Sequence, residues 1–192
     1  MKGAIGCIAA IVIGLVVVAL VVGGMYVSHK NQMVTLNEQV KASWSDVDVQ
    51  LQRRADLIPN LVATVKGFAQ HEEKVFGDIA AARSALLNAQ TPADKIAANQ
   101  QVTGALGRLL AISENYPQLK SNENFLKLQD ELAGTENRIN VARTRYNSSL
   151  QTYNTYVQQF PNSVFAKWAG FSVNNAYFQA DAASKEVPKV SF

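Results

Sequence analysis

One short stretch of the chain gathers several groups that could do chemistry. Residues 51–73 read LQRRADLIPNLVATVKGFAQHEE, in which arginine, histidine and carboxylates interrupt an apolar pattern. An enzyme would use the histidine and carboxylates as acid, base or metal ligands, and the arginines to bind an anion. The candidates for such a site are Arg53, Arg54, His71, Glu72 and Glu73, together with Glu114 and Glu136 from other helices.

The spacing of these groups does not favour catalysis. Neighbouring residues on a helix point about 100° apart, so His71 and Glu72 do not converge on one point. The sequence lacks the His-Glu-x-x-His zinc motif, the Glu-x-x-His pair of carboxylate-bridged bundles and glycine-rich phosphate loops. With two histidines and one cysteine, a metal would have to be held mainly by carboxylates. We therefore predict a protein that is not an enzyme, without catalytic residues, metal or cofactor.

The same charged residues have a structural interpretation. Arg53 and Arg54 lie opposite much of the apolar seam, where a solvated pair with Asp56 is sufficient explanation. Glu72 lies close to the seam, where an unpaired carboxylate is costly, so we expect it to pair with an arginine of the last long helix. The predicted buried ion-pair network comprises Glu72, Glu136, Arg138 and Arg143.

Helical periodicity predicts the elements that position these groups. Apolar residues recur at steps of three, four or seven over residues 40–86, and Pro59 predicts a kink or break within one long helix or two nearly collinear ones. Thr91 and Pro92 indicate a new helix that ends near Tyr116. A seam over residues 125–160 predicts the last long helix. The predicted fold class is all-α, with an elongated antiparallel bundle of three to four long helices after a membrane helix.

The amino-terminal segment has the composition of a membrane span. Residues 3–27 carry no charge, and at about 1.5 Å per residue they are long enough to cross a hydrocarbon core of about 30 Å. A cleaved signal peptide is the competing interpretation, but its apolar region is shorter, at about 7 to 15 residues. Cys7 weakly resembles a lipid-attachment site; we interpret it as an apolar residue of the span.

Small residues within this span could bring two helices together. Gly6, Ala10 and Gly14 follow one another at steps of four, which places them on one helical face. Such a face lets two backbones approach closely and predicts self-association in the membrane. The alternative is that glycine and alanine are simply common in membrane helices.

The carboxy-terminal tail is rich in large aromatic side chains. They could close the bundle, which we favour, or form an interaction surface for a partner. The residues of the predicted surface are Phe165, Trp168, Phe171, Tyr177 and Phe178, and Phe192 lies further on. The predicted division is therefore a membrane anchor at 1–28, a helical bundle at 29–160 and an aromatic tail at 161–192.

Four runs of sequence resemble the LemA family of bacterial proteins. They are QVKASWSDVDVQLQRRADLIPNLVATVKGFAQHE, ENYPQLKSNENFLKLQDELAGTENRINVARTRYN, YNTYVQQFP and the GF…AYF tail, which together cover most of the chain from Gln39 onward. The resemblance implies a single N-terminal membrane segment and an elongated helical domain in the bacterial inner membrane. It implies no established catalytic residues, and it leaves the side of the membrane open.

Two functions fit these features. The first is a non-enzymatic scaffold, held in the bilayer and assembling with copies of itself or with another membrane protein. The alternative is a sensor that binds a ligand between helices, near Tyr116, Tyr146 and Asn147. Nucleic acid is not an expected partner, because the net charge is only +3 and the basic residues are scattered among acidic ones.

Overall fold

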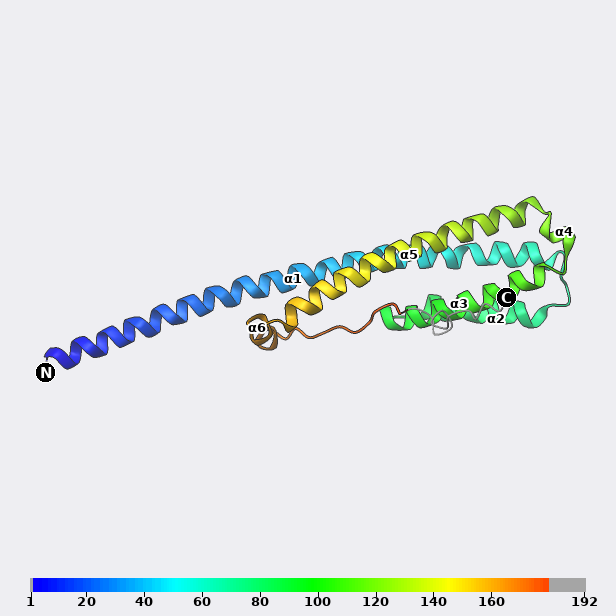
Figure 1. Ribbon diagram of the computed structural model, residues 1–192. Helices are drawn as coiled ribbons and strands as arrows, with labels where there is room; N and C mark the ends of the chain where they lie inside the picture. Colours follow the sequence, from blue (N-terminus) through cyan, green and yellow to red (C-terminus); the bar gives the residue numbers. More distant parts are fainter. Residues whose placement is uncertain (1, 180–192) are drawn as a thin grey trace, which may run out of the picture. The chain divides into compact units, whose positions relative to one another are not determined.

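The computed structural model describes residues 2–179, and all regular elements in that range are helices (Figure 1). This confirms the predicted all-α class. The helices are α1 (Lys2–Lys66), α2 (Glu73–Asn88), α3 (Pro92–Ser113), α4 (Pro117–Lys120), α5 (Glu123–Gln158) and α6 (Asn162–Ala169).

The described chain forms two compact units, and both contain part of α1 and part of α5. The first, called the α6 unit below, comprises residues 2–41 and 149–174. The second, the hairpin unit, comprises residues 42–148 and 175–179. The three-part division at residues 28 and 160 follows the chemical character of the sequence, and it stays a prediction.

The α6 unit buries apolar side chains from three helices. Its core contains Met33, Leu36 and Val40 of α1, Leu150, Tyr153 and Val157 of α5, and Phe165 and Ala166 of α6. These positions follow steps of three and four on α1 and α5, as expected for helices that bury one stripe each. The apolar run of α1 therefore continues, without an intervening loop, into residues that belong to a packed core.

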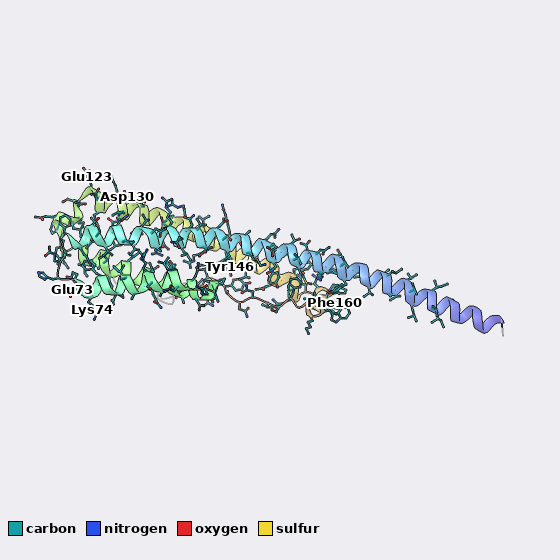
Figure 2. All side chains as sticks on the ribbon, turned by 180° about the vertical axis from the view of Figure 1, so that it is seen from behind. Glu73, Lys74, Glu123, Asp130, Tyr146 and Phe160 are labelled. Carbon is teal, nitrogen blue, oxygen red and sulfur yellow. The ribbon has the colours of Figure 1, made fainter. Side chains whose placement is uncertain are left out.

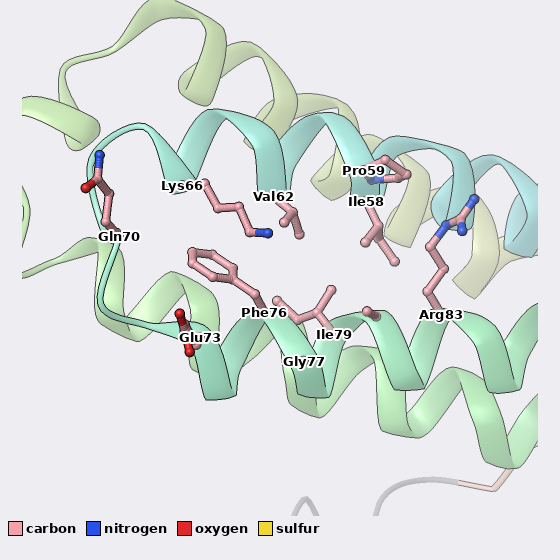
Figure 3. A pocket seen from close by; sticks show the side chains of 11 residues that line it. Ile58, Pro59, Val62, Lys66, Gln70, Glu73, Phe76, Gly77, Ile79 and Arg83 are labelled. Atoms are coloured by element: carbon pink, nitrogen blue, oxygen red, sulfur yellow. The ribbon is translucent and has the colours of Figure 1, made fainter.

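The hairpin unit contains a chain reversal that the periodicity did not predict. Residues 40–86 were expected to form one long bent helix or two nearly collinear ones, but α1 ends at Lys66 and α2 returns alongside it (Figure 3). The amides of Phe68 and Ala69 both bond to the Val65 carbonyl, which closes the last turn of α1. The prediction was wrong because the apolar spacing is the same for two helices that pack face to face as for two in line.

Pro59 does not break α1, and the reason lies on the next helix. Proline has no amide hydrogen, so the carbonyl of Ala55, four residues earlier, loses its helical partner. The Nε of Arg83 on α2 donates to this carbonyl oxygen at 2.8 Å. Ala55 is fully buried, so without Arg83 its carbonyl would be an unpaired polar group inside the protein. Arg83 thus replaces the missing helical hydrogen bond.

The remaining helix boundaries agree with the capping signals. Thr91 precedes α3 and its hydroxyl accepts a hydrogen bond from the Asp94 amide at 3.1 Å, which confirms the predicted N-cap. The helix ends at Ser113, three residues before Tyr116, and Pro117 begins the short α4. The last long helix, α5, begins at Glu123 after Asn122, whose side chain accepts from the Phe125 amide at 3.1 Å.

Candidate functional site

The most distinctive surface of the α6 unit is the apolar run of α1. The large apolar side chains between Ile11 and Val27 are 40% to 71% exposed. Soluble proteins rarely leave so much contiguous apolar area in water. By length and composition this part of α1 could cross a membrane, the one helix in the described chain that meets both criteria.

The predicted small-residue face lies within this run. Gly6, Ala10 and Gly14 all belong to α1, whose spacing places them on one side of the helix. Ala10 is exposed, and a side chain built at Gly14 would meet no other atom within 4 Å. The face is thus open to a second helix at its described positions, and self-association through it stays a proposal.

A group of aromatic rings, the α6 cluster, packs where the apolar run ends. Its members are Tyr26, His29, Tyr156, Phe165 and Trp168. The Phe165 ring stacks on the His29 imidazole with centroids 5.0 Å apart, and it meets the Tyr26 ring edge-to-face with centroids 6.3 Å apart. The His29 Nδ1 is 2.9 Å from the Tyr156 hydroxyl, and partial burial raises the pKa of Tyr156. These contacts fix α6 and α5 against α1 at residues 26–29.

The outer side of α6 remains open. Trp168 touches Phe165, with ring centroids 5.8 Å apart, yet it is 64% exposed. Phe160, just before the helix, is 85% exposed (Figure 2). Gly170 ends the helix with a φ of 77°, a left-handed conformation that glycine adopts without a steric penalty.

The hairpin unit contains a second aromatic group, the Trp44 cluster, formed by Trp44, Arg143, Tyr146 and Phe178. Tyr146 lies 5.2 Å from Trp44 and 6.0 Å from Phe178 between ring centroids, and it is 1% exposed (Figure 2). The Arg143 guanidinium lies 4.8 Å from the centre of the Phe178 ring. Burial, followed by the nearby Tyr177, raises the pKa of Tyr146, whose hydroxyl has no hydrogen-bond partner among the described residues.

Two asparagines of α5 bind the backbone of the tail. In the hairpin unit, the Asn147 amide donates to the Phe178 carbonyl at 2.9 Å, and its oxygen accepts from the Phe178 amide at 3.0 Å. In the α6 unit, Asn154 makes the same pair of bonds to Asn174, at 2.6 and 2.9 Å. Each side chain satisfies both polar backbone groups of one residue, as a neighbouring β-strand would. Sequence reasoning named Asn147 only as a candidate residue of a ligand pocket and missed Asn154, although their spacing of seven on one helix was a visible signal.

The predicted aromatic interaction surface is not one surface. Phe165 and Phe178 are buried, Phe171 and Tyr177 are partly exposed, and Trp168 alone of the five is largely open to solvent. Phe192 lies outside the described residues. Within the described tail, Phe178 closes the hairpin unit's core, whereas Trp168 leaves an apolar ring exposed in the α6 unit. The closing role therefore fits Phe165 and Phe178, whereas an interaction surface at Trp168 stays a prediction.

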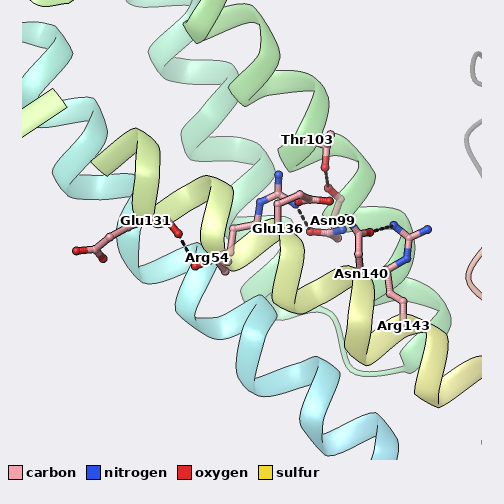
Figure 4. Close-up of polar contacts among 8 residues, drawn as sticks. Arg54, Asn99, Thr103, Glu131, Glu136, Asn140 and Arg143 are labelled. Atoms are coloured by element: carbon pink, nitrogen blue, oxygen red, sulfur yellow. Dashed lines mark hydrogen bonds and ion pairs between the residues drawn. The ribbon is translucent and has the colours of Figure 1, made fainter. Parts of the chain in front are cut away.

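The charged residues of the hairpin unit also differ from the predicted network. Arg54 is buried rather than solvated, and its Nη1 lies 2.9 Å from both the Glu136 carboxylate and the Asn99 side-chain oxygen (Figure 4). Burial lowers the pKa of Arg54, and the negative Glu136 opposes this shift. The missed signal was spacing: Arg54 stands three residues after Leu51 and four before Ile58, which is a seam position.

The other three members of the predicted network do not join it. Glu72 precedes α2 and makes no ion pair with any residue between 2 and 179. Arg138 donates to Gln50 and Thr135, and Arg143 donates to Asn140 and to the Gln179 carbonyl. The prediction failed because Glu72 lies in the reversal between two helices and not on a helical seam.

The groups considered for catalysis are not assembled into one site. His71 and Glu73 are exposed, and Glu114 pairs with Lys120 at 2.6 Å. None of these three residues joins the Arg54–Glu136 pair in the described chain. Arg53 is exposed too, and Asp56 accepts a hydrogen bond from Gln52 instead. Over the described residues, no group of three or more histidine, cysteine or acidic side chains could hold a metal ion.

A groove of about 670 Å³ lies between α1 and α2 (Figure 3). Ile58, Val62, Phe76 and Ile79 supply apolar walls, while Lys66, Glu73 and Arg83 supply charges. The Lys66 ammonium lies 5.3 Å from the centre of the Phe76 ring. The pocket predicted near Tyr116, Tyr146 and Asn147 does not form as one site, because Tyr116 lines a separate pocket of about 290 Å³ with Phe68 and Tyr146 is buried elsewhere.

Comparison with known proteins places these features in a family. The chain is similar to magnetosome protein MamQ 2 of Paramagnetospirillum magneticum, with 27% identity over 80% of this chain and 65% of that protein. It is similar to magnetosome protein MamQ of Magnetospirillum gryphiswaldense, with 28% identity over 73% of this chain and 61% of that protein. The chain thus spans less than two thirds of the length of these relatives.

A third relative and a family match give the same answer. Protein LemA of Metamycoplasma hominis is 24% identical over 81% of this chain and 71% of that protein. The sequence pattern of the LemA family matches residues 43–192, which begins within α1 and includes every helix that follows. The chain belongs to the LemA family.

Proposed function

We propose that this protein is a membrane-anchored scaffold without enzymatic activity, which assembles with copies of itself in the bacterial inner membrane. The observation that carries this proposal is the continuity of α1. Its exposed apolar run, up to Val27, leads without a loop into Met33 and Leu36, which are buried in the α6 unit. A helical domain joined to its anchor by one helix is held close to the bilayer surface, where it meets other membrane-bound chains.

Other observations support a scaffold. The buried Arg54 is accounted for by its pairing with Glu136 and Asn99, and the curated relatives are named as magnetosome proteins and Protein LemA rather than by a reaction. The face open at Ala10 and Gly14, which Gly6 extends by its spacing, offers a surface for a second membrane helix. We therefore assign self-assembly to the apolar run first.

The groove between α1 and α2 favours a second candidate function, the binding of a ligand or of a partner helix. Its volume of about 670 Å³ lies within the range of small-molecule sites, roughly 300 to 1,000 Å³. Its apolar walls and charged rim suit an amphipathic segment. Such a ligand or partner would make the protein a membrane-tethered sensor, acting with another membrane protein.

One set of variants separates these candidates. Gly14→Leu places a bulky side chain on the small-residue face, whereas Gly77→Leu places one in the groove, where an added Cβ atom meets no atom within 4 Å. Both substitutions replace glycine inside a helix, so helix propensity favours the variants by roughly 1 kcal/mol and loss of folding is not expected.

The measurement is the mass of the complex after gentle detergent extraction of the full chain. We expect a discrete oligomer that Gly14→Leu dissociates and Gly77→Leu leaves intact. If Gly77→Leu alone dissociates it, the groove is the assembly surface. A monomer in the unmodified chain would refute self-assembly and leave the sensor as the surviving candidate.

A further inference from the structure

We propose that Phe160, Val164 and Trp168 enter the headgroup region of the bilayer and give the protein a second membrane contact beside its helical anchor. The inference rests on the proposed function, because it requires the apolar run of α1 to lie in a bilayer. It adds that the start and outer face of α6 form a lipid-binding surface, which we call the α6 face.

The position of α6 along α1 is the first support. Phe165 packs on Tyr26 and His29, at the point where the exposed apolar run gives way to polar residues. If residues up to Val27 lie in the hydrocarbon core, residues 26–29 lie at the boundary between hydrocarbon and water. Trp168 touches Phe165 and is therefore held at the same level. Aromatic residues favour this boundary, where a ring can be buried while its polar atom stays wet.

The pattern of exposure on α6 is the second support. Asn162, Phe165 and Ala166 are buried, so one side of the helix is fixed to the unit. Val164 and Trp168 are four residues apart and share the opposite, exposed side, and the exposed Phe160 lies just before the helix. An exposed apolar face on a short helix, held beside a membrane anchor, matches an interfacial helix that lies in the plane of the membrane.

The charge of the α6 unit favours anionic lipid over a second copy of the unit as the partner of the α6 face. Lys30 and Lys167 are exposed near the α6 cluster, and residues 149–174 contain no acidic residue. The single acidic residue of the unit's α1 segment, Glu38, is already paired with Lys41 at 2.6 Å. Neither Lys30 nor Lys167 has an ion pair among residues 2–179, and a surface that combines aromatic rings with such lysines is complementary to anionic headgroups. A second copy of the unit would instead bring two cationic surfaces together.

The two tryptophans of the chain provide a matched experiment. Trp44→Phe leaves Trp168 as the single tryptophan, and Trp168→Phe leaves Trp44, which packs on Tyr146 and Phe178 in the hairpin unit. Each full-length variant is reconstituted into vesicles of mixed neutral and anionic phospholipid. The vesicles contain lipid brominated either near the headgroup or near the chain end, because bromine quenches tryptophan only on close approach. Flotation of the same samples reports anchoring independently.

We expect Trp168 to lose most of its emission with bromine near the headgroup and less with bromine near the chain end, whereas Trp44 keeps its emission. The α6 face is refuted if the protein floats with the vesicles while Trp168 is quenched only by iodide in the water. It is also refuted if Trp168 is shielded from both quenchers, which would indicate cover by protein. If the protein does not float, the proposed membrane anchoring is refuted, and so is the lipid contact of the α6 face, which requires it.

Discussion

The Trp44 cluster and the α6 cluster are built from the same kinds of side chain, but they differ in how far those side chains are buried. In the hairpin unit, Tyr146 is enclosed between Trp44 and Phe178, and the tail is bound there by Asn147. In the α6 unit, Phe165 is enclosed in the same way, but Trp168 and Phe160 remain exposed. The difference indicates that the aromatic residues of the hairpin unit stabilise a fold, whereas those of the α6 unit also form a surface.

The residues around each cluster explain why one is closed and the other is partly exposed. Several buried polar groups of the hairpin unit are paired, as with Arg54 and Asn99 or Arg83 and Ala55, whereas the Tyr146 hydroxyl has no partner among the described residues. Such pairing is needed where no water or lipid reaches. The exposed part of the α6 cluster adjoins the apolar run of α1, whose side chains are also uncovered. A bilayer would cover both at once.

The largest expected effect is on the free energy of unfolding, which a substitution should lower far more in the Trp44 cluster than on the α6 face. Tyr146→Ala removes a buried ring and should lower the free energy of unfolding by about 3 to 5 kcal/mol, whereas Phe160→Ala should change it by less than about 0.5 kcal/mol. Chemical denaturation of the full chain in detergent micelles, followed by helical circular dichroism, measures both. Tyr146→Phe is the matched control, because it keeps the ring and removes a hydroxyl without a described partner. Equal losses for Tyr146→Ala and Phe160→Ala would contradict the comparison.

The next effect tests the paired polar groups of the hairpin unit. Arg83→Ala leaves the buried Ala55 carbonyl without a donor and should cost about 1 to 3 kcal/mol. In a Pro59→Ala background the new amide hydrogen at position 59 can bond to that carbonyl, so the same substitution should cost less. A double-mutant cycle in denaturant measures the difference. Additive costs would show that Arg83 does not compensate for Pro59.

Asn147 should have a somewhat smaller effect. Asn147→Ala removes two hydrogen bonds from the Phe178 backbone, with an expected loss of about 1 to 2 kcal/mol. Release of Phe178 should also make Trp44 more accessible to aqueous acrylamide, while Trp168 is unchanged. Asn147→Asp keeps the acceptor for the Phe178 amide but loses the donor. Its free energy of unfolding should lie between those of the unmodified chain and Asn147→Ala. Unchanged quenching of Trp44 would show that Asn147 does not hold the tail.

The raised pKa of Tyr146 gives a smaller effect that depends on pH. Below the ordinary value of 10.0 the phenol is neutral in both states, so its contribution to stability is fully present. Above it the unfolded chain ionises first, and the free energy of unfolding falls as the pH rises toward the folded pKa. Melting temperatures measured on both sides of pH 10.0 should therefore fall less steeply for Tyr146→Phe. Parallel curves for the two proteins would exclude Tyr146 as the source.

The smallest effect on stability falls on the α6 face. Lys167 is exposed, so Lys167→Gln should change the free energy of unfolding by less than about 0.5 kcal/mol. Its loss should nevertheless weaken contact with anionic lipid by roughly 1 kcal/mol. Emission of Trp168 in the Trp44→Phe background, compared between anionic and neutral vesicles, measures that contact. A lysine effect of the same size in neutral vesicles would argue against headgroup charge as its cause.

Local signals in the sequence were sufficient for several elements. The Thr91–Pro92 start and the long seam of α5 follow from capping and periodicity, which depend on residues close in sequence. The uncharged run before Ser28 could likewise be identified from composition. These features needed no knowledge of which helices pack together.

Several missed features depend on pairs that are distant in sequence. Arg54 was assigned to the surface by its charge, and only Asn99 and Glu136, on two other helices, explain its burial. Pro59 was expected to kink or break α1, and the donor that supports its helix lies 24 positions later, at Arg83. The exposure of Trp168 could not be predicted either, because the aromatic tail has the same composition where it closes a core and where it does not.

If the apolar run of α1 crosses a bilayer, its two ends lie on opposite sides of the membrane. Cysteine labelling of the two ends tests this. Cys7→Ala removes the single cysteine, and Lys2→Cys or Lys30→Cys then places one thiol at either end of the run. Each protein is reconstituted into sealed vesicles in one orientation and treated with a maleimide that cannot cross lipid. We predict that one thiol reacts before detergent is added and the other only afterwards. Reaction of both thiols in intact vesicles would contradict a membrane span.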